Sequence, residues 1–155
     1  MDGNIRFHSV DLRDAEETCA LFRTVKPDVV FHFASASGGS AGLDNMLPQL
    51  QNDIDTTVNC LVAAKKPGTG RIIIPGSTDE PAPGSSAIPD SPYAMATTTR
   101  VNFGKMFYNL YGTSVVICRI FMAYGPGLKP RKVSLHYSVD ARSEVSQAIL
   151  WCEDG

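Results

Sequence analysis

Short runs of β-branched and apolar residues alternate along the chain with longer segments that place an apolar residue at every third or fourth position. This alternation predicts strand, helix, strand units, which fold into a parallel sheet. The run at 28–34 (DVVFHFA) is almost continuously apolar, as is typical of a central strand covered on both faces. The sequence therefore predicts an α/β domain.

The expected elements follow one another without a repeat. Five of the ten prolines fall within 75–92, so we expect a long loop there. The tight turn that we expect at 124–127 (YGPG) would follow the last strand. We expect strands at 5–10, 28–34, 71–74 and 114–121, and helices at 14–25, 52–65, 92–111 and near 144–152.

Charge and composition exclude several classes of partner. The 14 basic and 16 acidic residues give a net charge of -2 with no basic block, which argues against nucleic acid. No apolar run approaches the ~20 residues that a membrane-spanning helix needs, and the first residues do not resemble a signal peptide. We therefore expect a cytoplasmic protein. Its four cysteines are scattered, which favours buried thiols over a disulfide or a metal site.

Four segments stand out: 11–14 (DLRD), 26–34 (KPDVVFHFA), the pair 72–78 (IIIPGST) with 92–97 (PYAMAT), and 116–127 (VICRIFMAYGPG). In order and spacing they resemble the extended short-chain dehydrogenase/reductase family, specifically its NAD-dependent nucleotide-sugar epimerases and dehydratases. The resemblance implies a Rossmann-like doubly wound parallel sheet and an NAD or NADP cofactor. It places these residues at the cofactor: Asp11, Leu12, Phe33, Ala34, Ser35, Tyr93 and Phe121.

Two residues in these segments, Asp11 and His32, have alternative interpretations. An aspartate that follows a strand, as Asp11 does, is often a helix cap, and Asp14 is a good candidate for that role. His32 lies between two phenylalanines in a predicted strand, where a hydrogen-bonded structural histidine is more common than a ligand or a base. Both alternatives remain open from the sequence.

The segments 72–78 and 92–97 together imply the catalytic groups. By resemblance, Ser77 takes the place of the catalytic serine or threonine and Tyr93 that of the catalytic tyrosine. Hydride leaves a sugar carbinol carbon for nicotinamide only if the hydroxyl proton is removed, so Tyr93 would act as the base and Ser77 would share the hydrogen bond. The resemblance assigns the nucleotide-sugar substrate to Ser77, Thr78 and Met122, with 119–127 on the substrate side.

The chain departs from the family pattern at three places. Thr97 stands at the lysine of the Y-x-x-x-K motif and supplies no charge to stabilise a phenolate, so we expect the catalytic position to be weakened. Arg100 shares a helix face with Tyr93 and Thr97 and could lend charge, but a solvated or ion-paired surface arginine is favoured. Met122 replaces an asparagine, which removes a polar substrate contact.

The third departure is that no G-x-x-G-x-x-G is found. The glycines at 38, 39 and 42 lack the strand, turn and helix context of that fingerprint. By resemblance the chain begins at the third strand of the fold. We therefore expect a partial cofactor domain at 1–133 without its first βαβ unit, a remnant of the C-terminal region at 134–155, and a bare sheet edge at 28–34.

Three functional hypotheses remain at this point. The first is a nucleotide-sugar epimerase or dehydratase, truncated or inactive. The second is a non-catalytic family member that binds a partner or a nucleotide sugar, and the third is a reductase that acts on a non-sugar carbonyl. A homodimer or a separate partner chain would cover the open sheet edge.

Overall fold

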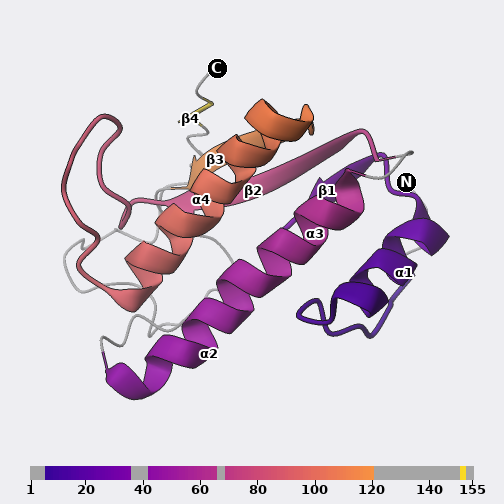
Figure 1. The fold of residues 1–155 in the computed structure, drawn as a ribbon, viewed down its shortest axis with the longest axis horizontal. Coiled ribbons are helices and arrows are strands. Elements are labelled where there is room, and N and C mark those ends of the chain that lie inside the picture. The colour runs from indigo at the N-terminus through magenta and orange to yellow at the C-terminus, as the bar shows by residue number, and fades with distance from the viewer. Residues whose placement is uncertain (1–5, 36–41, 66–68, 121–150, 153–155) are drawn as a thin grey trace, which may run out of the picture.

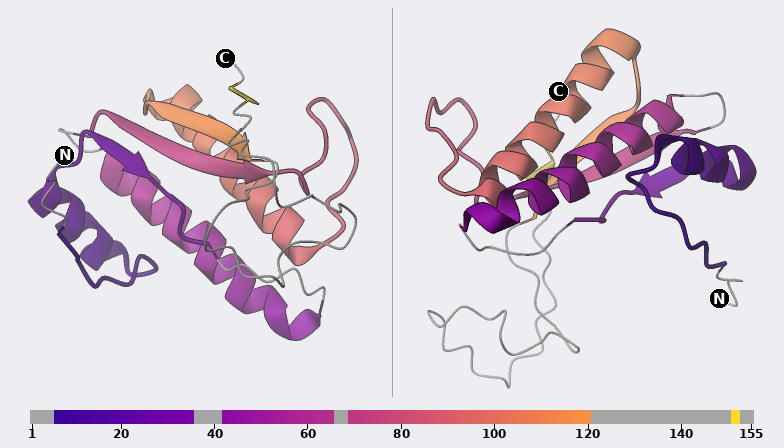
Figure 2. Two further views of the ribbon diagram at one scale, coloured as in Figure 1. Left: turned by 180° about the vertical axis from the view of Figure 1, so that it is seen from behind. Right: turned by 60° about the horizontal axis from the view of Figure 1, so that its bottom comes forward.

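The computed structural model describes residues 6–35, 42–65, 69–120 and 151–152. Its sheet has the order β1-β2-β3-β4, in which the first three strands are parallel and β4 is antiparallel to β3. The helices α3 and α4 lie side by side on one face of this sheet, and α1 packs beside α3 (Figures 1 and 2). The strands are β1 (Val29–Phe31), β2 (Arg71–Ser77), β3 (Val115–Ile120) and β4 (Trp151–Cys152).

The helices begin and end at recognisable capping residues. Asp14 accepts hydrogen bonds from the backbone amides of Glu16 and Glu17, and Ser91 caps the helix that has Pro92 in its first turn. That long helix ends at Gly112, which adopts φ 63°. The helical segments are α1 (Ala15–Val25), a 3-10 turn (Leu43–Asn45), α2 (Met46–Leu50), a π-helical turn (Gln51–Asp55), α3 (Thr56–Ala64) and α4 (Pro92–Tyr111).

The core lies between β2 and the helix layer. Ile72 and Ile74 are fully buried there against Leu61 of α3. A Cβ on Gly104 of α4 would lie 3.0 Å from Ile117 Cδ1 and 3.1 Å from Ile74 Cδ1, so glycine lets this helix approach the sheet closely. The contact seats α4 on β2 and β3. No helix in the described ranges is long and apolar enough to cross a membrane.

The predicted helices at 14–25 and 92–111 and the strand at 71–74 are confirmed, and the strand predicted at 114–121 is confirmed over 115–120. Residue 121 lies outside the described residues. The helix at 52–65 is confirmed over 56–64, although a π turn replaces its first turn. The predicted loop at 75–92 is wrong at its start, because 75–77 belong to β2. Pro75 is tolerated there because its nitrogen, which carries no hydrogen, faces β1, and the ladder between β1 and β2 has already ended at Ile73.

Two further predictions of secondary structure are wrong. Residues 6–10 form no strand, and Phe7 is 92% exposed, because no described strand lies beside them to pair with their backbone groups. Trp151–Cys152 is a strand and not the end of a helix, since it pairs with the outer edge of β3. The remainder of that predicted helix and the turn at 124–127 lie outside the described residues.

The prediction that 28–34 is covered on both faces is also wrong. Only Val29–Phe31 forms a ladder, and Val29 and Phe31 are 46% and 64% exposed on the face away from α3 and α4. His32 is buried on the helix side. In the described part of the chain β1 pairs with β2 alone, which agrees with the expected open edge.

Candidate active site

Ser77 ends the central strand β2 in a closely held position. Its backbone amide donates to Glu80 Oε1 at 2.6 Å, and its Oγ accepts from the amide of Asp79 at 3.2 Å. Arg119 Nε on β3 donates to the Ser77 carbonyl at 3.0 Å. The side chain is only 9% exposed, so its hydroxyl is fixed at the carboxyl end of the sheet.

Arg119 also fixes the loop that follows β2. Its Nη2 donates to the carbonyl of Pro81 at 2.7 Å and to that of Glu80. Gly76 leaves room for this arrangement, because a Cβ there would lie 2.7 Å from Glu80 Oε1. The substrate-side position predicted for Arg119 stays a prediction, but its guanidinium is engaged by backbone carbonyls. Glu80 was not predicted from the sequence, because its carboxylate reaches the Ser77 amide only once the turn after β2 has formed.

Tyr93 lies in the first turn of α4 and is half-buried. The start of α4 and the carboxyl end of β2 lie at the same end of the sheet and are joined by the loop 78–91 (Figure 1). Ser77 and Tyr93 therefore come to the same end of the molecule, as the resemblance implies. Ala34 and Ser35, at the carboxyl end of the neighbouring parallel strand β1, are exposed and small.

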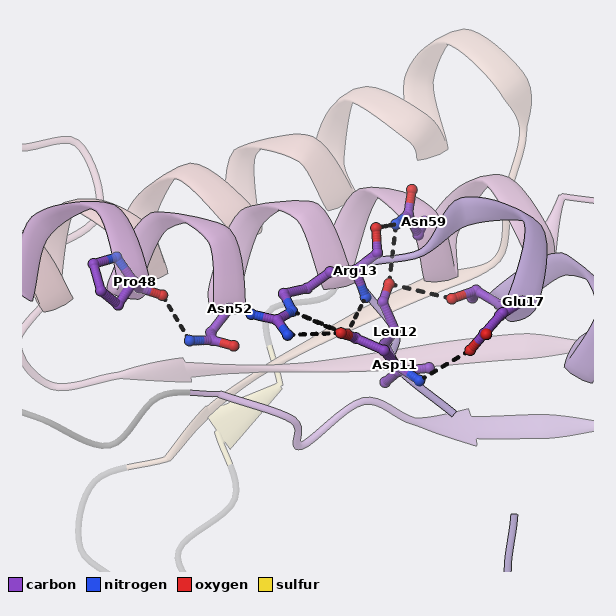
Figure 3. A network of polar contacts seen from close by, with 8 residues as sticks. Asp11, Leu12, Arg13, Glu17, Pro48, Asn52 and Asn59 are labelled. Carbon is purple, nitrogen blue, oxygen red and sulfur yellow. Dashed lines mark hydrogen bonds and ion pairs between the residues drawn. The ribbon is translucent and has the colours of Figure 1, made fainter. Parts of the chain in front are cut away.

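Asp11 belongs to a separate polar network (Figure 3). Arg13 Nε donates to its Oδ1 at 2.9 Å and Nη2 to its Oδ2 at 2.6 Å, and these hydrogen bonds lower the pKa of Asp11 to about 2. Asn59 Nδ2 on α3 donates at 2.9 Å to the carbonyls of both Leu12 and Arg13. Asp11 is exposed and is not the helix cap, which is Asp14. Phe121 and Met122 lie outside the described residues.

Arg100 is not the surface arginine that the sequence favoured. It is 2% exposed, and its Nη1 lies 3.4 Å from Oδ1 of Asp53, which is fully buried in the π turn. Gln49 Nε2 donates to the other oxygen of the same carboxylate. Thr97 is also fully buried. The sequence analysis missed Asp53, whose spacing from Thr57 and Cys60 on one helix face was an available signal.

His32 is a buried, hydrogen-bonded histidine, as the alternative interpretation held. It is 3% exposed, and its Nε2 lies 3.0 Å from Thr57 Oγ1. Burial, and after it the positive charge of Arg100, lower the pKa of His32 from 6.5 to about 4. The ring is therefore neutral near pH 7 and cannot serve as a general acid there.

This lowered pKa predicts a loss of stability in mild acid. As the pH falls below 6.5 the unfolded chain takes up a proton at His32, whereas the folded chain does so only near pH 4. The free energy of unfolding should therefore decrease across that window, by up to about 3 kcal/mol from this group. Urea unfolding of wild-type protein and a His32→Gln variant at pH 7.5 and pH 5 measures the effect. Equal pH dependence in both proteins would contradict the assignment.

Comparison with known proteins supplies the wider context. Residues 1–155 match the model of the NAD dependent epimerase/dehydratase family. Over 136 residues the chain is 26% identical to a UDP-glucuronate 4-epimerase of Thermodesulfobacterium geofontis (strain OPF15), covering 82% of this chain and 42% of that protein.

Solved structures show the same similarity. The fold resembles a dTDP-glucose 4,6-dehydratase from Streptomyces venezuelae with NAD and TYD bound, with a TM-score of 0.71 and 26% identity, covering 84% of this chain and 42% of that one. It also resembles a UDP-glucuronic acid 4-epimerase from Bacillus cereus in complex with NAD, with a TM-score of 0.63 and 24% identity, covering 76% and 40% of the two chains. The chain thus spans about two fifths of the length of these relatives.

Proposed function

The chain belongs to the NAD-dependent epimerase/dehydratase family, and from this premise we propose that it carries the serine and tyrosine of a nucleotide-sugar oxidoreductase site. The observation that supports the proposal best is Ser77, held by Glu80 and Arg119 at the carboxyl end of the central strand. Ligands of open α/β sheets bind at this edge. Tyr93 begins the helix at the same end.

In the proposed reaction Tyr93 removes the proton from a sugar hydroxyl while the carbon that bears this hydroxyl loses hydride, which leaves a carbonyl. Ser77 hydrogen-bonds to the sugar oxygen and steadies it, and Thr78, which is exposed beside it, contacts the sugar. A nicotinamide dinucleotide held at the carboxyl end of the sheet would supply the hydride acceptor. We propose a UDP- or dTDP-linked sugar as the substrate, because the relatives named above act on such compounds.

The residues on the nicotinamide side of the proposed site fit such a cofactor. Ala34 and Ser35 are small and exposed where β1 ends, so a flat ligand can approach the sheet edge closely. Phe33, which is 57% exposed, and the loop residues Asp11 and Leu12 are the further contacts that we propose. We propose NAD, with which the relatives from Streptomyces venezuelae and Bacillus cereus were crystallised.

One observation favours a second candidate, a non-catalytic protein that binds a nucleotide sugar. Thr97 is fully buried and neutral, and the nearby cation Arg100 is paired with Asp53. A tyrosine without a cation beside it provides less of the phenolate that would act as the base at neutral pH. Such a chain would keep the substrate position and lose the chemistry.

Hydride transfer tests the proposal directly. The chain is mixed with NAD and either dTDP-glucose or UDP-glucuronate, and conversion of the sugar nucleotide is followed by chromatography. Epimerisation and dehydration return the hydride to the sugar, so no net reduced nicotinamide accumulates. We expect at least one of the two sugars to be converted. Binding of a nucleotide sugar in calorimetry without conversion would favour the non-catalytic candidate, and an absence of both would contradict the two proposals together.

A further inference from the structure

A polar cluster is buried between the π turn and α4. Its charged members are Asp53 at 0% and Arg100 at 2% exposure, and Gln49 and Thr97 are buried with them at 3% and 0%. Among the residues that the structure describes, Arg100 is the one buried cationic side chain. Charged side chains are rarely buried to this extent unless they are paired.

The contacts within the cluster join elements that are far apart in the sequence. Arg100 Nη1 lies 3.4 Å from Asp53 Oδ1, and Gln49 Nε2 donates a hydrogen bond to Oδ2 of that carboxylate. Among the described residues, Arg100 Nε and Thr97 Oγ1 have no hydrogen-bond partner. The ion pair is thus a direct polar connection between the π turn and the buried face of α4.

The π turn itself is fixed by threonine hydroxyls. Thr57 Oγ1 donates to the Asp53 carbonyl at 2.6 Å, and Thr56 Oγ1 donates to the Asn52 carbonyl at 2.6 Å. His32, just after β1, approaches the same Thr57 hydroxyl at 3.0 Å. The Asp53 carboxylate is therefore presented to α4 by a rigid turn that is anchored to the sheet.

We propose that Asp53 and Arg100 are positioning residues: their buried ion pair locks the helix that carries Tyr93 onto the π turn and so sets the position of the tyrosine. Tyr93, Thr97 and Arg100 lie on one face of α4, so a lock at Arg100 constrains the first two turns of the helix. The role given to Tyr93 rests on the proposed function. The lock, by which we mean the Asp53–Arg100 ion pair that holds α4 to the π turn, does not depend on that function.

Breaking one half of the pair should release the helix. In Asp53→Asn and Arg100→Met one buried group loses its partner, and we expect the amides in the first half of α4 to exchange with solvent about 10²- to 10³-fold faster. Arg23→Met, at an exposed arginine of α1, is the matched control and should leave this exchange unchanged. The double variant Asp53→Leu/Arg100→Met has no buried charge and should recover protection.

Two spectroscopic readouts separate positioning from stability. The Tyr93 ring resonances should shift in both single variants and remain in place in Arg23→Met. The pKa of His32, which faces the Thr56 and Thr57 hydroxyls, Asp53 and Arg100, should rise from about 4 in Arg100→Met, because the cation is lost and the carboxylate remains. If a single variant fails to fold, the His32 titration of the double variant Asp53→Leu/Arg100→Met measures the same loss of the Arg100 cation.

Unchanged exchange in α4 together with unchanged Tyr93 resonances in either single variant would overturn the proposal. So would a double variant whose His32 titrates as in the wild type. None of these measurements requires cofactor or sugar. If they give the expected results while hydride transfer fails, the proposed function falls and the lock stands.

Discussion

Tyr93→Phe is expected to lower the rate of hydride transfer by about 10²- to 10⁴-fold, because the substitution removes the group that we propose takes the substrate proton. The ring is half-buried at the start of α4, and phenylalanine preserves its shape and packing. The free energy of unfolding should therefore stay close to that of the wild type. The rate is measured as the conversion of a nucleotide sugar in the presence of NAD, followed by chromatography.

Tyr108→Phe is the matched control for this substitution. Tyr108 lies near the other end of α4 and is 56% exposed, so loss of its hydroxyl should leave the rate unchanged. A Tyr93→Phe protein that transfers hydride at the wild-type rate would show that another group takes the proton. The serine and tyrosine assignment would then be wrong.

Thr97→Lys is expected to destabilise the fold by about 3 to 5 kcal/mol, even though it restores the residue that the family motif contains. Thr97 is fully buried, and one turn away Arg100 already takes the Asp53 carboxylate. A lysine there would place a second cation beside a single buried anion. For a chain of this length the melting temperature should fall by roughly 10 °C.

Met95→Lys provides the control, because Met95 lies on the same helix and is 40% exposed. Its melting temperature should stay within about 2 °C of that of the wild type. The double variant Thr97→Lys/Arg100→Ala gives the new lysine a free carboxylate and should recover most of the lost stability. A Thr97→Lys protein as stable as the wild type would contradict the view that Arg100 fills the cationic place on this helix.

The double variant Thr97→Lys/Arg100→Ala also separates the two proposed functions. A lysine at position 97 lies one helical turn from Tyr93, whereas Arg100 lies two turns away, so its cation is the nearer to the phenol even when Asp53 is close, and a damaged enzyme should gain turnover. A protein that only binds nucleotide sugars should stay inactive. The comparison requires a folded chain, which is why Arg100 has to be changed together with Thr97.

Local sequence signals predicted the elements whose ends are set by their own residues. Pro92 and Gly112 bracket α4, and Asp14 caps α1, so both helices could be read directly. The buried strand at 71–74 was predicted from a run of isoleucines, although its continuation through Pro75 was not. That proline is tolerated because a neighbouring ladder has ended, which is a property of β1 and not of the local sequence.

The errors have one physical origin. A strand exists only with a neighbour, so residues 6–10 do not form one, and the pairing of Trp151–Cys152 with β3 depends on residues far away in the sequence. Hydrophobicity at 28–34 indicated burial but could not say which face would be covered. Asp53 and Arg100 are 47 residues apart in the sequence, and no local pattern predicts their contact.

The site was predicted in part for the same reason. Ser77 and Tyr93 lie at the strand end and helix start that the motifs implied, because those motifs include the local turn chemistry. Their roles remain proposals. Arg100 was considered as a source of charge, but its burial and its carboxylate partner appear only in the folded chain.

Calorimetric titration of the chain with NAD and NADP, in oxidised and reduced form, tests the central claim most directly. Ala34→Leu, at the carboxyl end of β1, should weaken binding, whereas Ala87→Leu, in the exposed part of the 78–91 loop, should not. The account predicts saturable binding of NAD with a Kd near ~1 μM, about 8 kcal/mol. A folded chain that binds none of these dinucleotides at millimolar concentration would contradict it.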